Sequence, residues 1–133
     1  MKFKSITMKL LLKARPENVY NALTNPLEHS RFTGAKATGG DIVGGKFTAW
    51  DGYIHGRVIE LVKNERIVLE WLTTEWPKDY PPSIVKFTLE RKGEFTELVL
   101  VHSKVPASQA SSYRQGWLDY YWTPLKNYFH MKK

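Results

Sequence analysis

The stretch RQGWLDYYWTPLKNYF, from Arg114 to Phe129, decides how the rest of the chain can fold. Together with the residues before it, the stretch predicts one long helix from about Ser108 to Phe129. On a helical wheel of about 100° per residue, its apolar side chains cover an arc of about 200°, which includes Tyr113, Trp117, Tyr120 and Tyr121. An arc that wide requires neighbours on several sides, so we expect a curved sheet to hold the helix. We expect Pro124 to kink the last turn.

Two rings of this stretch fall outside the apolar arc. The wheel places Trp122 and Phe129 beside Gln115 and Lys126, on the polar side of the helix. We therefore expect both rings to be exposed and, with Lys126, to contact a protein partner. The alternative is that the rings cover the sheet edge or the N-terminal helices. Gly116 lies at the edge of the arc, where we expect a close approach between helix and sheet.

The N-terminal part of the chain predicts one strand and two short helices. The strand is indicated by apolar residues at alternate positions, namely Ile6, Met8, Leu10 and Leu12. Pro16 is typical of a first helical turn, and Asn25-Pro26 ends that helix and begins a second one, which ends near Gly34.

The middle of the chain reads entirely as strands joined by short turns. The segments YIHGRVIELV, RIVLEWLTTEW, SIVKFTLER and TELVLVHSKV are rich in β-branched and aromatic residues. Short turns favour an antiparallel meander. We therefore predict a single domain over residues 1–133, of the α+β class. A curved antiparallel sheet wraps around a long C-terminal helix, and two short helices follow the first strand. Such a sheet does not close fully on a helix, so we expect a cavity between them.

Composition limits the function more by what it excludes than by what it indicates. The 133 residues include no cysteine, which rules out disulfides, thiolate metal sites and a cysteine nucleophile. The net charge of +7 favours acidic partners, although scattered lysines and arginines are also typical of plain solvation. The chain has no apolar run of membrane-spanning length and no signal-peptide core, so we predict no membrane association and a cytoplasmic location.

No motif in the chain predicts catalysis, a cofactor or a metal. Gly40 to Lys46 has the spacing of a phosphate-binding loop, but Phe47 replaces the Ser or Thr and a strand follows, so we interpret it as a turn. The histidines lack metal-ligand spacing. No carboxylate pair or Ser/His/Asp set stands out, so we predict no enzyme. Rings concentrated on a buried helical arc do not favour nucleic-acid binding.

His102 shares a strand face with Leu98 and Leu100. We expect it to point into the cavity, and the alternative is a hydrogen-bonded core histidine.

Four segments resemble a known family. They are GGKFTAWDGYIHGRVIELVKNERIVLEW, WPKDYPPSIVKFTL, TELVLVHSKVP and YRQGWLDYYWTPLKNYF. They are similar to the START-like, or helix-grip, superfamily and, within it, to the family named for the activator of the ATPase of the 90-kDa heat-shock chaperone. The likeness is to the C-terminal domain of that co-chaperone, above all in WDG, the loop beginning WP, and RQGW..YY. It covers nearly the whole chain.

The resemblance implies a non-enzymatic, co-chaperone-like binding protein with an auxiliary contact on a 90-kDa heat-shock-type chaperone. Nothing in the chain matches the family's separate N-terminal domain, so full ATPase activation is not implied.

The wider superfamily implies an alternative, a carrier or sensor of a small apolar ligand. We expect the cavity that binds this ligand to be lined by Trp50, Trp71, His102, Tyr113, Trp117 and Tyr121. A cavity of ~300 Å³ or more with a mouth favours a ligand, and a filled core with an exposed Trp122 favours a protein partner.

Overall fold

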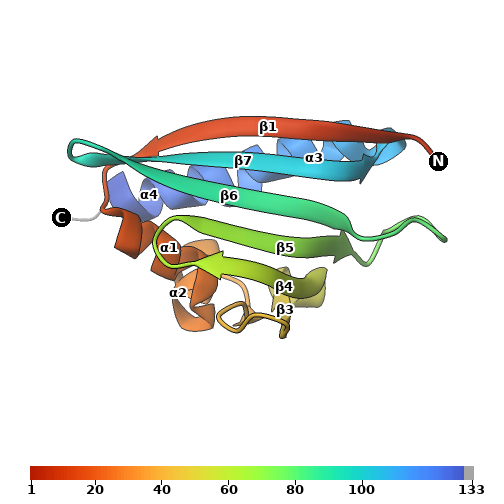
Figure 1. The fold of residues 1–133 in the computed structure, drawn as a ribbon, viewed down its shortest axis with the longest axis horizontal. Helices are drawn as coiled ribbons and strands as arrows, with labels where there is room; N and C mark the ends of the chain where they lie inside the picture. Colours follow the sequence, from red (N-terminus) through yellow and green to blue (C-terminus); the bar gives the residue numbers. More distant parts are fainter. Residues whose placement is uncertain (131–133) are drawn as a thin grey trace.

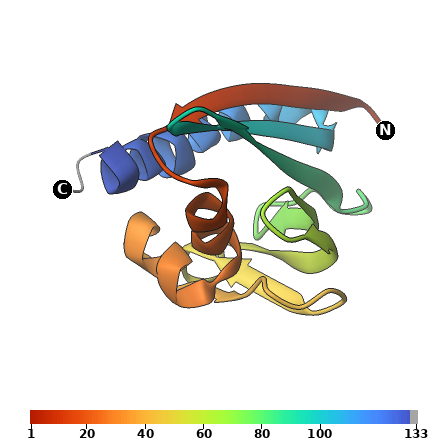
Figure 2. The same cartoon turned by 60° about the vertical axis from the view of Figure 1, so that its left-hand side comes forward.

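Seven antiparallel strands form one open, curved sheet in the computed structural model, which describes residues 1–130 (Figure 1). Their order across the sheet is β1-β7-β6-β5-β4-β3-β2. The long C-terminal helix and two short helices lie on the same face of this sheet (Figure 2). The strands are β1 (Phe3–Leu12), β2 (Thr38–Gly39), β3 (Lys46–Ala49), β4 (Ile54–Val62), β5 (Arg66–Thr73), β6 (Ser83–Lys92) and β7 (Phe95–Pro106).

The strands confirm the predicted meander, because β3 to β7 pair each with the next along the chain. β1 pairs with β7 and buries the alternate residues predicted from its sequence, Ile6, Met8, Leu10 and Leu12. The pairing shifts between Lys4 and Ile6 and again between Val58 and Glu60. Irregularities of this kind bend a strand and increase its twist, which lets the sheet curve around the helix.

The two short helices form where the sequence predicts them. Helix α1 (Pro16–Thr24) has Pro16 in its first turn, where the missing N–H is not needed. Helix α2 (Pro26–Thr33) begins after Asn25, whose side chain accepts hydrogen bonds from the backbone N–H groups of Leu27 and Glu28. It ends at Gly34, whose left-handed conformation suits glycine.

The C-terminal helix is continuous but not uniform. It consists of α3 (Ala110–Trp117), a π-helical turn η3 (Leu118–Trp122) and α4 (Thr123–His130), after a short 3₁₀ turn η2 (Ala107–Gln109). The Thr123 N–H donates to the Leu118 carbonyl, five residues back. In a regular α-helix the ring of Pro124 would clash with the carbonyl four residues before it, and the wider turn avoids this. The irregularity expected at Pro124 is therefore a π turn before it.

The π turn overturns the expectation that Trp122 is exposed. In a π turn each residue rotates by less than 100° about the helix axis, so the wheel misplaces the residues at its end, and Trp122 points toward the sheet. Its side chain is 5% exposed, and its Nε1 donates to the Lys9 carbonyl at 3.2 Å. Tyr120, which the wheel places inside the buried arc, is 54% exposed instead. The alternative that the ring covers a sheet edge is the correct one, because β1 is an edge strand.

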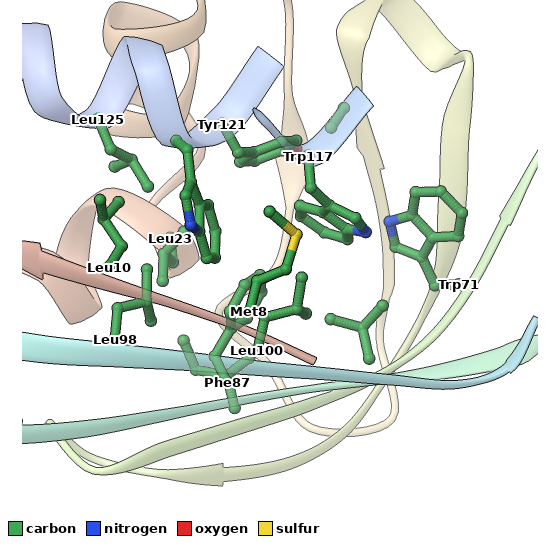
Figure 3. Close-up of a cluster of buried hydrophobic side chains, with 14 of the residues drawn as sticks. Met8, Leu10, Leu23, Trp71, Phe87, Leu98, Leu100, Trp117, Tyr121 and Leu125 are labelled. Carbon is green, nitrogen blue, oxygen red and sulfur yellow. The ribbon is translucent and has the colours of Figure 1, made fainter. Parts of the chain in front are cut away.

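The core lies between the helix and the strands of the β1 end of the sheet. Leu125, Leu98 and Leu100 are fully buried there, and Leu10 packs beside them (Figure 3). Trp117 and Tyr121 continue this layer along the helix toward Trp71 on β5. The interior beyond those rings, toward β4, is not filled.

Candidate functional site

A cavity of about 720 Å³ lies at the unfilled end of the helix. Its wall comes from the helix on one side and from β4, β5 and the turn η1 (Trp50–Gly52) on the other. The volume is well above ~300 Å³ and is typical of sites for drug-sized ligands. Three tryptophans and four tyrosines contribute to the lining, which consists of Trp50, Tyr53, Ile54, Trp71, Glu75, Gln109, Ser112, Tyr113, Gly116, Trp117, Tyr120 and Tyr121.

Five of the six side chains predicted to line a ligand cavity do line it, namely Trp50, Trp71, Tyr113, Trp117 and Tyr121. The sixth, His102, does not. The sequence analysis missed Tyr53, Glu75, Gln109 and Tyr120, which are exposed or half-buried and so lie where the cavity opens to solvent. A signal was present for two of them, since Tyr53 directly follows WDG and Glu75 directly precedes the WP loop.

The turn η1 holds Trp50 in the cavity wall. Trp50 and Asp51 both have positive φ, at 52° and 58°, which costs of order 1 kcal/mol for each non-glycine residue. The Asp51 N–H donates to the Lys36 carbonyl, and the Asp51 Oδ1 accepts from the Lys36 N–H. These two bonds hold the strained turn in place. Its position is therefore set by the chain before β2, not by β3 and β4 alone.

Tyr121 forms the inner wall beside two polar neighbours. Its hydroxyl lies 2.9 Å from Nε2 of His29, whose ring stacks on Phe32. Burial raises the pKa of Tyr121, and the nearby Trp50 indole N–H opposes that rise. That N–H is itself buried and makes no hydrogen bond within residues 1–130. Burial also lowers the pKa of His29 to about 4, so the pair is neutral at pH 7.

His102 is a hydrogen-bonded core histidine, which was the alternative to a cavity-lining role. The Trp117 Nε1–H donates to its Nδ1 at 3.1 Å, so the proton of the neutral ring lies on Nε2. Nε2 lies 2.8 Å from the Ser83 Oγ, which in turn donates to the Trp71 carbonyl at 2.6 Å. Both ring nitrogens of His102 and the hydroxyl of Ser83 therefore have partners.

This arrangement is unsuited to nucleophilic catalysis. His102 is 0% exposed, and burial lowers its pKa to about 3. A ring nitrogen that carries a proton cannot take one from Ser83, and the Ser83 hydroxyl is already committed to a carbonyl. We conclude that His102 supports the cavity wall by fixing the Trp117 indole.

The opening of the cavity is held together by hydrogen bonds around Glu75. Tyr53 donates from its hydroxyl to Oε1 of Glu75 at 2.7 Å. The Gln109 Nε2 donates to the Glu75 carbonyl, and the Glu75 N–H donates to Oγ1 of Thr73. The Tyr113 hydroxyl bridges Thr73 and Gln109 at 2.7 and 2.9 Å. The segment after β5 is therefore fixed to the start of the C-terminal helix.

Gly116 is not the close-approach point predicted from the wheel. A Cβ atom added there would meet only the Tyr120 side chain, at 3.8 Å. Gly116 faces the cavity instead.

The three predicted partner residues do not form one exposed patch. Trp122 is buried, Phe129 is half-buried against the core, and Lys126 is exposed. The partner role expected for Trp122 depended on its exposure. Phe129 and Lys126 therefore stay as predictions of a partner contact.

Other motifs considered in the sequence have simpler roles. The glycine-rich stretch after Gly39 forms a turn that leads into β3, which confirms the predicted turn. Among the described residues, no group of His, Asp and Glu side chains could hold a metal ion. None of the helices in residues 1–130 is both long and apolar enough to span a membrane.

Comparison with known proteins agrees with the fold and the sequence segments. The family described as "Activator of Hsp90 ATPase homolog 1-like protein" matches residues 13–130. The human activator of 90 kDa heat shock protein ATPase homolog 1 is 34% identical over 124 residues, which are 93% of this chain. The chain spans only 36% of that relative's length.

Two solved structures are similar to this chain. The crystal structure of an Hsp90 activator from Plasmodium falciparum has a TM-score of 0.71 and 30% identity, and the match covers 77% of this chain and 74% of that one. The solution structure of the Aha1 dimer from Colwellia psychrerythraea has a TM-score of 0.83 over 98% of both chains, but at 20% identity it supports the fold alone. These matches confirm the predicted helix-grip fold. The chain belongs to the family of activator of Hsp90 ATPase homolog 1-like proteins.

Proposed function

We propose that this chain is a non-enzymatic, co-chaperone-like binding protein that contacts a 90-kDa heat-shock-type chaperone in the cytoplasm. The observation that carries the proposal is its 34% identity, over 93% of its length, to a protein named as an activator of that chaperone's ATPase. Because the match spans about a third of the activator, we assign an auxiliary contact and not the activation itself.

The surface charge suits such a contact. The chain has 20 lysines and arginines against 13 aspartates and glutamates. Within residues 1–130, ion pairs form between Glu28 and Arg31, Glu60 and Arg66, and Glu90 and Lys92. Most cationic side chains in that range therefore stay available to an acidic partner. A contact of this kind is electrostatic and weakens as salt screens the charges.

The test is calorimetry with the chaperone from the same organism, at low and at physiological salt. We expect weak binding that falls clearly once the Debye length drops to about 8 Å. Lys126→Glu should weaken binding several-fold, whereas Lys46→Glu, on the β3 strand, makes the same charge change and should weaken it less. We expect little or no stimulation of the ATPase by this chain alone. The absence of heat at low salt, with both proteins folded, would contradict the proposal.

The cavity favours a second function, binding a small apolar ligand as a carrier or sensor. The specific observation is a cavity of about 720 Å³ that is lined by the side chains of seven aromatic residues. This volume exceeds the ~300 Å³ that the sequence analysis set as favouring a ligand. Trp122 is buried, whereas an exposed Trp122 would have favoured a protein partner. The two functions are compatible, because the cavity and the exposed Lys126 involve different residues.

An apolar fluorescent probe such as Nile red tests this second function. We expect micromolar binding to the wild-type chain. Gly116→Leu should reduce it at least tenfold, because the new side chain enters the cavity without meeting the backbone. Ser111→Leu places the same side chain at an exposed position of the same helix, outside the cavity lining, and should leave binding unchanged. Equal binding by both variants would contradict a cavity site.

A further inference from the structure

The charge of the cavity lining is opposite to that of the protein. The chain carries a net charge of +7, yet no lysine, arginine or histidine lines the cavity. The lining contains one carboxylate, Glu75, and seven aromatic rings. A ligand in the cavity therefore meets one negative charge, several aromatic rings, and uncharged polar groups such as the Gln109 amide, the Ser112 hydroxyl and the Trp50 indole N–H.

Glu75 is positioned before any ligand arrives. Its backbone is held at both ends, by the Gln109 Nε2 on the carbonyl and by Thr73 Oγ1 on the N–H. The Tyr53 hydroxyl occupies Oε1 at 2.7 Å. No hydrogen bond to Oε2 and no ion pair of Glu75 is formed with any residue in the part of the chain that the structure describes.

The neighbours of Glu75 keep the charge at the opening at one. Burial and then the hydrogen bond to Glu75 raise the pKa of Tyr53 to about 12, so its phenol stays neutral at pH 7. Burial, opposed by the Thr73 bond, raises the pKa of Tyr113 as well, and the Glu75 charge adds to that rise. The opening therefore holds two neutral hydroxyls around a single carboxylate that no cation neutralises.

We propose that the cavity selects an organic cation, with its ammonium group at the opening beside Glu75 and its apolar body deeper, against Trp71 and Trp117. Aromatic faces attract cations, and a carboxylate at the rim adds a full opposite charge. Those two indoles lie with ring centroids 5.7 Å apart (Figure 3), and both are buried side chains of the cavity lining. The same rim repels carboxylate ligands such as fatty acids. This inference rests on the second proposed function, ligand binding in the cavity.

Three naphthalene probes of similar size separate charge from shape. They are (2-naphthylmethyl)trimethylammonium, the uncharged 2-naphthylmethanol and the anion 2-naphthaleneacetate. Calorimetry with the full chain at pH 7 and low salt measures all three. We expect the cation to bind at least tenfold more tightly than the anion, and the uncharged probe to bind between them.

Two variants with the same change in net charge locate the effect. Glu75→Gln keeps the size of the side chain and removes the rim charge. We expect it to weaken cation binding about three- to tenfold, to leave the uncharged probe within twofold, and to strengthen the anion. Glu94→Gln, in the exposed turn between β6 and β7, is the control and should change none of the three.

The outcomes distinguish the inferred preference for cations from the proposed ligand binding on which it rests. If the uncharged probe and the anion bind as tightly as the cation, or if Glu75→Gln and Glu94→Gln weaken the cation equally, the cation site is overturned while a ligand cavity stands. If no probe of any charge binds the folded wild-type chain and Nile red does not bind either, the ligand function itself fails.

Discussion

The space between the C-terminal helix and the sheet is filled at one end of the helix and open at the other. At the α4 end, Leu125 is fully buried against Leu98 and Leu10, and the interior is solid (Figure 3). At the α3 end, the helix still lies against β1, but a cavity of about 720 Å³ separates it from β4 and β5. A sheet that curves around a straight helix can be in close contact along only part of its length. The packed end provides stability, which leaves the open end free to bind.

Trp122→Ala should produce the largest effect, because it removes a buried ring from the packed side. We expect a loss of about 3–5 kcal/mol in the free energy of unfolding, measured by urea denaturation. Tyr120→Ala, two residues earlier and largely exposed, should cost less than about 1 kcal/mol, mainly for its ring contact with Trp50. Similar losses for both variants would show that the π turn does not set the helix phase in solution.

Acidification should lower the free energy of unfolding through His102, which holds the Trp117 indole between the packed and the open ends of the helix. The pKa of His102 is lowered to about 3 in the folded chain, against about 6.5 when unfolded. Below pH 6.5 the unfolded state therefore binds a proton that the folded state does not, so stability is full above pH 6.5 and falls as pH drops toward 3. The slope is about 1.4 kcal/mol per pH unit for this group.

His29, with its pKa lowered to about 4, adds to the loss in the same direction. Urea denaturation between pH 7 and pH 4.5 measures the slope. His102→Gln should lower stability at pH 7 and make the slope shallower by about 1.4 kcal/mol per unit. A slope identical to that of the wild type would contradict a neutral, buried His102.

Gly116→Ala should give the smallest effect, and it should be stabilising. Gly116 lies in α3, and alanine there gains about 0.5–1 kcal/mol from helix propensity. The open side of the helix has room for the methyl group, since the nearest atom would be 3.8 Å away. A higher melting temperature with unchanged Nile red binding is the expected result. If the variant is less stable than the wild type, the close approach of Gly116 to the sheet, first predicted from the wheel, would be supported instead.

Much of the fold was predictable because it depends on local patterns. Alternation placed Ile6 to Leu12 on one strand face, and Asn25-Pro26 marked the junction between α1 and α2. Three of the five correctly predicted cavity residues, Tyr113, Trp117 and Tyr121, were predictable from the helix, since large rings on a wide buried arc must line whatever space the sheet leaves. The limits of the domain, residues 1–133, stay a prediction.

Other features could not be predicted from local patterns. The wheel assumes a constant angle per residue, and the π turn before Pro124 breaks that assumption, so Trp122 and Tyr120 exchange places. Glu75 and Gln109 are 34 residues apart in the sequence, and only the packed chain brings them to one opening.

The sequence by itself determined which elements form and that the C-terminal helix would be held by a sheet, because side-chain periodicity and turn residues act over a few positions. The tertiary structure alone decided where the space between helix and sheet is filled and where it stays open, since that depends on how strand irregularities and one π turn add up over the whole sheet. It also decided that His102 faces Trp117 and Ser83, closing a hydrogen-bond chain, while the carboxylate of Glu75 is left at the rim of the cavity.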